Sequence, residues 1–455
     1  MDLTVIGGGL AGCEAAWQAA ERGLQVRLYE MRPVKNTGAH TSPDLAELVC
    51  SNSLGSTLDD RPSGLLKNEL RSLNSMLLEC AEATALPAGT ALAVDRAGFA
   101  KLVTQRIMGH PRIEVIREEV CEIPGGLTVI ASGPLTSESL VNSISKISGE
   151  DYLFFFDAIA PIVAADSINM EIAFRGSRYD RSALAEGDYI NCPMDRMIYE
   201  NFERELAQAE RIEIKEFEKA IQDGVKAGIH EYFEGCLPVE VLAGRGSRAL
   251  AFGPMRPVGL RNPQTGFRPY AVVQLRQDNL AGDLYNMVGF QTNLTYPEQR
   301  RVFRMIPGFE NAEFVRYGQM HRNTFIASPK LLSLSLQFRT RSNLFFAGQI
   351  VGVEGYMGNI ATGLLAGLNA ARQVNGEDLL VFPRTTMIGA LAYYITHAEM
   401  ADFQPMKANM GILPELGGGR MGKKDRALAH SQRSRIDLEA FILQTGLYNT
   451  EDTGK

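Results

Sequence analysis

The chain has 455 residues, of which 45% are hydrophobic and 22% charged, a composition typical of a globular protein with two or three domains. No apolar run reaches the roughly 18 residues of a membrane span, and Met1 leads directly into the first predicted strand, so we expect no signal peptide and a cytoplasmic location. The formal net charge of −7 disfavours nonspecific polyanion binding, so any nucleic-acid site must be a local basic patch.

The first thirty residues carry the strongest signal. A short apolar strand at 2–6 is followed by the run G-G-G-L-A-G, an Ala-rich helix over 13–22 and a second strand over 25–29. In this G-x-G-x-x-G pattern, Gly7 permits a tight turn, Gly9 lets the backbone approach a pyrophosphate and Gly12 allows close packing of helix on strand. Glu30 is placed to accept hydrogen bonds from an adenosine ribose. These features predict a Rossmann-type dinucleotide site.

The remainder of the first third completes this predicted domain. Residues 32–62 are rich in Pro, Ser, Thr, Asn and Asp, which indicates a long ordered and functional loop. Helical spacing resumes at 65–80 and again at 95–108. Two apolar runs, 113–116 and 127–131, predict further strands, and the second stops at small residues as a dinucleotide-contacting strand does. Residues 1–150 therefore form the first part of the dinucleotide-binding domain.

The middle third, residues 151–335, has a different pattern. The apolar stretch at 152–165 begins a new sheet, helices are predicted over 194–208 and 215–227, and strand-like runs follow at 270–275 and 284–290. We interpret this segment as a mixed α+β insertion domain.

A second strand–glycine–helix unit returns in residues 336–455. The strand at 343–349 ends in glycine, and a glycine-rich segment at 352–358 precedes a small-residue helix over 359–372. Such a distant second unit is how a discontinuous FAD domain closes around its cofactor, so the pattern favours FAD over NAD as the tightly held cofactor. The predicted cofactor contacts are Gly348, Gln349, Gly355, Tyr356 and Asn359. From residue 383 onward the chain reads as helical and polar. The expected fold is α/β, a discontinuous Rossmann-type FAD-binding domain with an insertion domain.

One window of the insertion is strongly basic. Residues 241–277 contain no acidic side chain and six arginines: Arg245, Arg248, Arg256, Arg261, Arg268 and Arg276. The planar guanidinium forms paired hydrogen bonds with phosphate, and the interleaved Phe252, Phe267 and Tyr270 are suited to stacking on bases. We predict phosphate or RNA contact here, with Arg245, Arg248, Arg256, Arg261 and Arg268 as the RNA-binding residues; the alternative is a solvated basic face, or arginines paired with acids elsewhere.

Six scattered cysteines form no C-x-x-C pair and no Cys/His cluster, so we expect reduced thiols, no disulfide and no metal. Two of them, Cys50 at the end of the polar loop and Cys236 beside a Pro-bearing turn, are candidates for thiolate chemistry. The alternative is that both are small buried hydrophobes, as we expect for Cys13 and Cys80.

The motifs also resemble a known family over essentially the whole chain. The matching segments are VIGGGLAGCEAA, YEMRPV, ELVCSNSL, ALAVDR, YINCPM, FEGCLPVE, GPMRPVGL, GQMHRNTFI, FAGQIVGVEGY and FQPMKANMGILP. They resemble the bacterial folate- and FAD-dependent tRNA uracil-54 C5-methyltransferases. Larger relatives that modify wobble uridines, the glucose-inhibited division protein A family, carry an additional C-terminal helical domain, so an end at Lys455 favours the methylating branch.

The resemblance implies a reaction. Methylenetetrahydrofolate donates a one-carbon unit, reduced FAD supplies the electrons, and NADH or NADPH reduces the flavin. The target is the uridine at position 54 in the T-loop of tRNA, which must flip outward to reach the flavin. The resemblance implicates both Cys236 and Cys50; we assign Cys236 as nucleophile and Cys50 as general acid/base, with the reverse assignment open. Tyr356 is expected to pack against the isoalloxazine.

Two other functions remain open from the sequence. A general FAD oxidoreductase acting on a small molecule explains the glycine fingerprint but leaves the acid-free arginine window without a role. A noncatalytic tRNA-binding flavoprotein explains both, and in it Cys50 and Cys236 are only structural.

Overall fold

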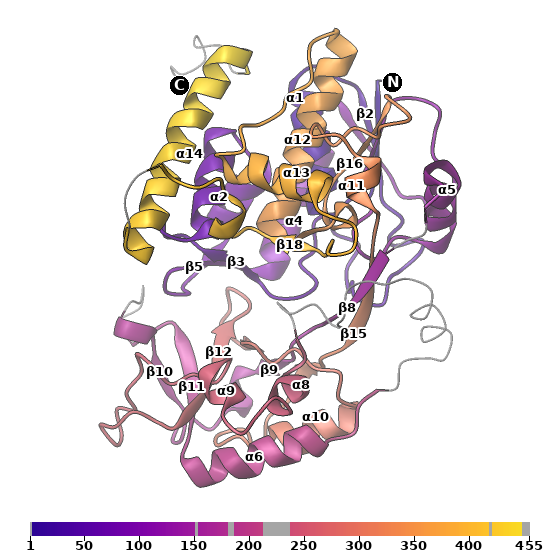
Figure 1. Ribbon diagram of the computed structural model, residues 1–455. Coiled ribbons are helices and arrows are strands. Elements are labelled where there is room, and N and C mark those ends of the chain that lie inside the picture. Colours follow the sequence, from indigo (N-terminus) through magenta and orange to yellow (C-terminus); the bar gives the residue numbers. More distant parts are fainter. Residues whose placement is uncertain (1, 151–152, 181–185, 213–236, 418–420, 448–455) are drawn as a thin grey trace.

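The computed structural model describes residues 2–150, 153–180, 186–212, 237–417 and 421–447. Figure 1 shows two parts, an upper one built from the first and last thirds of the sequence and a lower one built from the middle third. Each has its own core: one set of buried apolar side chains spans Leu3 to Ile144 and Phe325 to Leu447, and the other spans Val163 to Ala312. Cys236 and the predicted helix at 215–227 lie outside the described residues.

A five-stranded parallel sheet forms the centre of the upper part, in the order β16-β7-β1-β2-β6. Most apolar side chains of its short, largely β-branched strands are buried, as expected for a parallel sheet covered by helices. Ile6 pairs with both Tyr29 and Ile130, so these strands end together at one edge. The α/β fold expected from the sequence is confirmed. The strands are β1 (Leu3–Ile6), β2 (Val26–Tyr29), β6 (Ile113–Ile116), β7 (Thr128–Ile130) and β16 (Leu344–Phe346).

Two helices from opposite ends of the sequence pack closely beside this sheet, α1 (Leu10–Glu21) and α12 (Tyr356–Asn375). A β-carbon at Gly363 would lie 2.3 Å from the carbonyl oxygen of Ala11, and one at Gly367 would lie 2.5 Å from that of Ala15. Only glycine allows the two backbones to touch at these positions. The predicted helix at 359–372 therefore exists, but it begins earlier, directly after Gly355.

The segment between β2 and β6 corrects two expectations. The predicted helix at 65–80 is two helices, because Asn74 adopts a positive φ of 51° and Ser75 then caps the next helix by accepting from the Leu78 amide. The predicted loop at 32–62 contains a short strand. The elements here are β3 (Ser53–Ser56), α2 (Pro62–Ser72), α3 (Met76–Ala83), β4 (Ala85–Leu86), β5 (Ala91–Val94) and α4 (Arg96–Gly109), and α5 (Glu138–Ser148) follows β7.

The lower part is built on a six-stranded antiparallel sheet in the order β10-β11-β12-β13-β9-β14. Its strands are β9 (Ile162–Ala164), β10 (Phe174–Gly176), β11 (Tyr189–Met194), β12 (Ala271–Gln277), β13 (Leu284–Met287) and β14 (Phe314–Arg316). The helices that pack around it are α6 (Arg196–Gln208), α8 (Val239–Ala243), α9 (Ala249–Phe252) and α10 (Tyr296–Phe303). The predicted helix at 194–208 begins two residues later, after the Asp195 side chain caps it.

An antiparallel pair of strands, β8 (Leu153–Ala158) and β15 (Met320–Phe325), runs between the two parts (Figure 1). The chain then returns to the upper part through α11 (Ser328–Leu331), α13 (Met387–His397) and α14 (Lys423–Thr445), with β17 (Val353–Glu354) pairing in parallel with β18 (Met406–Lys407). The expectation of a polar C-terminal region is wrong for α13, whose Met387, Leu391 and Ile395 are buried in the core.

Candidate functional site

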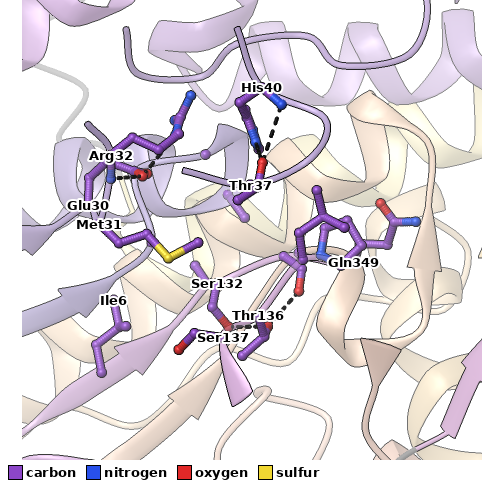
Figure 2. A pocket seen from close by; sticks show the side chains of 18 of the residues that line it. Ile6, Glu30, Met31, Arg32, Thr37, His40, Ser132, Thr136, Ser137 and Gln349 are labelled. Atoms are coloured by element: carbon purple, nitrogen blue, oxygen red, sulfur yellow. Dashed lines mark hydrogen bonds and ion pairs between the residues drawn. The ribbon is translucent and has the colours of Figure 1, made fainter. Parts of the chain in front are cut away.

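A cavity opens at the carboxyl ends of the parallel strands (Figure 2). Parallel α/β sheets bind ligands at this edge, where the loops that follow the strands converge. Ile6, Tyr29 and Ala131 come from the ends of β1, β2 and β7. Most of the predicted cofactor residues line it, namely Gly7, Gly9, Glu30, Gly348, Gln349, Tyr356 and Asn359. These residues thus lie together at one cavity, and their role in binding a cofactor stays a prediction.

The glycine loop has the geometry that its spacing predicts. Gly7 has a φ of +105°, and a β-carbon at Gly12 would lie 1.8 Å from the carbonyl oxygen of Gly7, so Gly12 lies behind the cavity wall. A β-carbon at Gly9 would meet no atom within 4 Å. Gly9 is also the N-cap of α1 and offers no side chain to its first turn. The N–H groups there are therefore suited to an anionic ligand.

Glu30 is part of a buried charge network that the sequence did not indicate. Its Oε2 accepts from the Gly8 amide at 2.9 Å, and its Oε1 accepts from Arg32 Nε at 2.9 Å. Arg32, only 2% exposed, also contacts Glu47 Oε2 at 3.2 Å. Burial raises the pKa of Glu30, but the hydrogen bonds and charge of Arg32 outweigh it and the pKa is lowered. Glu30 is therefore a carboxylate at the cavity edge.

Hydroxyl and imidazole groups complete the polar lining. Thr37 Oγ1 lies 2.5 Å from His40 Nδ1, and Ser132 Oγ lies 2.8 Å from Thr136 Oγ1 (Figure 2). Burial, reinforced by the charge of Arg32, lowers the pKa of His40 to about 4, so this imidazole is neutral at pH 7. These residues were missed individually; the only sequence signals were the polar loop at 32–62 and the small residues after 127–131.

The second glycine-rich segment closes the cavity from the other side. Gln349 Nε2 donates to Glu354 Oε2 at 2.7 Å, and Gly348 donates its amide to Thr362 Oγ1 at 2.9 Å. Asn359 is 9% exposed and its Oδ1 has no hydrogen-bond partner. A buried carbonyl oxygen without a donor is unfavourable in a folded protein. This atom is therefore suited to accept a hydrogen bond from a ligand.

A second cavity adjoins the first and contains Cys50. The two share part of their lining, Val49, Pro134, Leu135, Gln349, Tyr356 and Asn359. Cys50 is half-buried, and its backbone N–H donates to the hydroxyl of Tyr356 at 3.0 Å. Gly355 also lines this second cavity. The structure therefore places Cys50 in a cavity that adjoins the first and shares Gln349, Tyr356 and Asn359 with it, whereas Cys236 lies outside the described residues.

The basic window divides into exposed and buried arginines. The five arginines predicted to contact RNA are all exposed on the lower part: Arg245, Arg248, Arg256, Arg261 and Arg268. Phe252 and Phe267 are exposed beside them, and the Arg248 guanidinium lies 4.8 Å from the Phe252 ring centre. Arg276 is the exception, because it is 7% exposed and donates from Nε to Asn52 Oδ1 at 2.8 Å. Arg276 therefore belongs to the basic window in sequence but not to its exposed surface.

Cys13 and Cys80 are buried, as predicted. Burial raises the pKa of Cys80 to about 11 and raises that of Cys13 further, so neither is a thiolate near neutral pH. Among the described residues, no group of three or more His, Cys, Asp and Glu side chains is placed to bind a metal ion. No helix in the described ranges is long and apolar enough to cross a membrane.

Comparison with known proteins places this geometry in a family. A model of the family described as glucose inhibited division protein A matches residues 2–378. The methylenetetrahydrofolate--tRNA-(uracil-5-)-methyltransferase TrmFO of Bacillus subtilis is 54% identical over 95% of this chain and 96% of its own. The protein of the same name from Heliobacterium modesticaldum is 54% identical over 98% of both chains.

A solved structure shows the same fold. A crystal structure of Aquifex aeolicus GidA aligns with a TM-score of 0.67 at 14% identity, covering 99% of this chain and 74% of that one. At this identity the likeness concerns the fold alone. The sequence matches are far closer, and they extend over nearly the whole chain. The chain therefore belongs to the glucose inhibited division protein A family and, within it, to the TrmFO group of proteins.

Proposed function

We propose that this protein methylates carbon 5 of the uridine at position 54 in the T-loop of tRNA, with methylenetetrahydrofolate as the one-carbon donor and reduced FAD as the electron source. The observation that carries the proposal is the position of Cys50 in a cavity that shares Gln349, Tyr356 and Asn359 with the predicted cofactor cavity. The name of relatives that are 52–55% identical, methylenetetrahydrofolate--tRNA-(uracil-5-)-methyltransferase, supports the substrate class.

The residues of the first cavity fit FAD. The uncapped first turn of α1 and the open space at Gly9 suit a pyrophosphate, and the Glu30 carboxylate suits a ribose hydroxyl. Gly348, Gln349 and Asn359 would contact the flavin end, where the Asn359 Oδ1 lacks a donor. When bound, FAD supplies the reducing electrons for methyl formation, and NADH or NADPH replenishes them.

The cysteines supply the activation of the uracil. Carbon 5 of uracil becomes nucleophilic only after a thiolate adds to carbon 6, which forms a carbon–sulfur bond and places negative charge on the ring. Carbon 5 then bonds to the methylene of methylenetetrahydrofolate as the carbon–nitrogen bond to the folate breaks and tetrahydrofolate leaves. A base takes the proton from carbon 5, and elimination of the thiolate together with two-electron reduction of the methylene gives the methylated ring. We assign Cys236 as the nucleophile and Cys50 as the acid/base.

Exposed residues of the lower part support an RNA partner. Five arginines and two exposed phenylalanines lie within one acid-free window. Arginines bind phosphates, and aromatic side chains stack on unpaired bases. A flipped T-loop uridine requires such contacts to its neighbours, since unstacking a base costs a few kcal/mol.

The test uses tRNA from cells that lack the protein, the purified holoenzyme, methylenetetrahydrofolate and NADPH. Mass spectrometry of the T-loop fragment should show one added methyl on uridine 54 that requires the folate. The Cys50→Ala and Cys236→Ala variants should each lose methylation while retaining flavin. Methylation that survives in both variants would eliminate the thiol mechanism. Flavin reduction by NADPH without any methyl transfer would favour an oxidoreductase acting on a small molecule.

A further inference from the structure

The backbone of Cys50 is fixed from two sides by residues distant in sequence. Its N–H donates to the Tyr356 hydroxyl at 3.0 Å, and its carbonyl oxygen accepts from Arg96 Nη2 at 3.2 Å. Arg96 is the first residue of α4, and its Nη1 also donates to the carbonyl oxygen of Leu48. One guanidinium therefore binds the Cys50 loop, defined here as residues 48–52, at two carbonyl groups.

The lower part of the molecule holds this guanidinium in place. Arg96 Nε donates to Asp278 Oδ2 at 3.1 Å and Arg96 Nη2 donates to Asp278 Oδ1 at 2.8 Å, which is a two-pronged ion pair. The side chains are 13% and 4% exposed. Asp278 directly follows β12. A paired geometry of this kind restricts both side chains, and its strength depends on the flat fork of arginine.

A second contact between the parts lies two residues after Cys50. Asn52 is fully buried and donates from Nδ2 to the Val94 carbonyl at 2.9 Å and to the Gln277 carbonyl at 2.8 Å. Its Oδ1 accepts from Arg276 Nε at 2.8 Å. All polar atoms of the Asn52 amide side chain are thus used, which fixes the Cys50 loop between β5 and β12.

Charged groups of both signs surround the Cys50 loop, with the positive ones in excess. Arg96 from α4, Arg276 from β12 and Arg316 from β14 interact electrostatically with Asp278, and Arg316 also with Glu47. Lys407 and Glu354 line the same cavity as Cys50. Burial lowers the pKa of Arg96, but Asp278 raises it more, with smaller contributions from Tyr356 and Cys50, so Arg96 stays cationic. A nearby guanidinium favours the thiolate form of a cysteine, which is the reactive form.

We propose that Arg96 is the positioning residue of Cys50: it fixes the cysteine backbone, places a positive charge near the thiol, and is itself held by Asp278 across the two parts of the molecule. The role in catalysis rests on the function proposed above for Cys50. The effect of the Arg96 charge and contacts on Cys50 does not depend on that function, because it can be measured on the Cys50 thiol without methyl transfer.

The test is the pH profile of Cys50 alkylation by iodoacetamide in the holoenzyme, followed by mass spectrometry of the peptide. Arg96→Ala should move the midpoint upward by about half a unit or more and slow alkylation at pH 7 about three-fold or more, since a favourable charge is lost. Asp278→Asn should move the midpoint downward, because it removes a negative charge while weakening the same ion pair. Arg96→Lys keeps the charge and should stay near the wild-type midpoint.

Two internal references distinguish this effect from unfolding. Cys121 is exposed and should keep its alkylation profile in every variant, and Arg106→Ala removes another arginine of α4 whose partner Glu79 lies away from the Cys50 loop. Unchanged Cys50 midpoints in Arg96→Ala would overturn the proposal, and so would shifts of the same sign in Arg96→Ala and Asp278→Asn. If Arg96→Ala loses its flavin, the Cys50 midpoints of Arg96→Lys and Asp278→Asn test the proposal instead. Methylation by these variants, scored separately, tests the function.

Discussion

At the scale of single residues, two glycines of the G-x-G-x-x-G motif lack a side chain for different reasons. Gly12 needs the absence of a β-carbon for the fold itself, because the Gly7 carbonyl oxygen occupies that space. Gly9 has open space around it and lines the cavity, so its lack of a side chain leaves room for a ligand. Substitution should therefore affect stability at one position and binding at the other.

We predict that Gly12→Ala destabilises the protein by about 2–4 kcal/mol, because the new methyl group would overlap a backbone oxygen that cannot move without displacing β1 or α1. Urea unfolding of the flavin-free protein measures this effect. Gly9→Ala is the matched control: it should unfold like the wild type but bind FAD about ten-fold more weakly or worse, because the methyl enters the pyrophosphate space. Equal stability of the two variants would contradict the assignment.

At the scale of secondary structure elements, Glu69 joins three helices. This residue of α2 is 2% exposed and accepts from the amides of Met387 and Ile388, the first two residues of α13, at 2.6 and 2.9 Å. It also accepts from Ser434 Oγ of α14 at 2.6 Å. A carboxylate at a helix N-terminus is favourable, yet burial raises the pKa of Glu69 to about 7 despite these hydrogen bonds.

This raised pKa predicts a pH dependence of stability. A carboxyl group whose folded pKa is above its unfolded value binds more protons in the folded state, so its contribution is complete below about pH 4.5 and is lost as the pH rises through about 7. As the pH rises from 4.5 to 7.5, the wild type should therefore lose stability relative to Glu69→Gln. The urea midpoint should fall by the equivalent of on the order of 1–3 kcal/mol in the free energy of unfolding. Glu439→Gln, at an exposed position of α14, should follow the wild type. Parallel curves for wild type and Glu69→Gln would show that Glu69 does not titrate in this window.

At the scale of the whole molecule, the lower part carries the exposed basic window and the upper part carries the first cavity (Figure 1). The second cavity is lined by both parts, with Cys50 and Tyr356 from the upper and Ile159 and Gln291 from the segment around β9 and β13. An RNA held on the lower part would thus lie on the same part that closes the cavity around Cys50.

We predict that charge reversal of Arg256 and Arg261 together weakens tRNA binding about ten-fold or more at 0.1 M salt and lowers the salt dependence of the affinity by roughly two counterions. Flavin content should be unchanged because both side chains are exposed. Arg27→Glu reverses a half-exposed charge on β2 and serves as the control. Unchanged affinity and salt slope in the double variant would remove this window from the RNA-binding surface.

The amino-acid sequence by itself determined the parts of this protein that depend on local pattern. The G-x-G-x-x-G run, the strands at 113–116 and 127–131 and the return of a glycine-bearing unit near 348 follow from spacing within a few residues. They suffice for the parallel sheet of the upper part and for several residues that line its cavity. The expected division near residues 150 and 335, and the roles of the individual site residues, remain predictions that the two separate cores and the cavity lining support.

Only the tertiary structure decided the contacts between residues that are far apart in sequence. Cys50 and Tyr356 are separated by 306 positions, and Asn52 and Arg276 by 224, yet each pair is hydrogen-bonded. No local periodicity indicates such pairs. The sequence placed Arg276 in the basic window without indicating that it is buried. It also did not indicate that Arg32 lies buried between two carboxylates. A buried charge is stable only with its partners, and those partners are assembled by the fold.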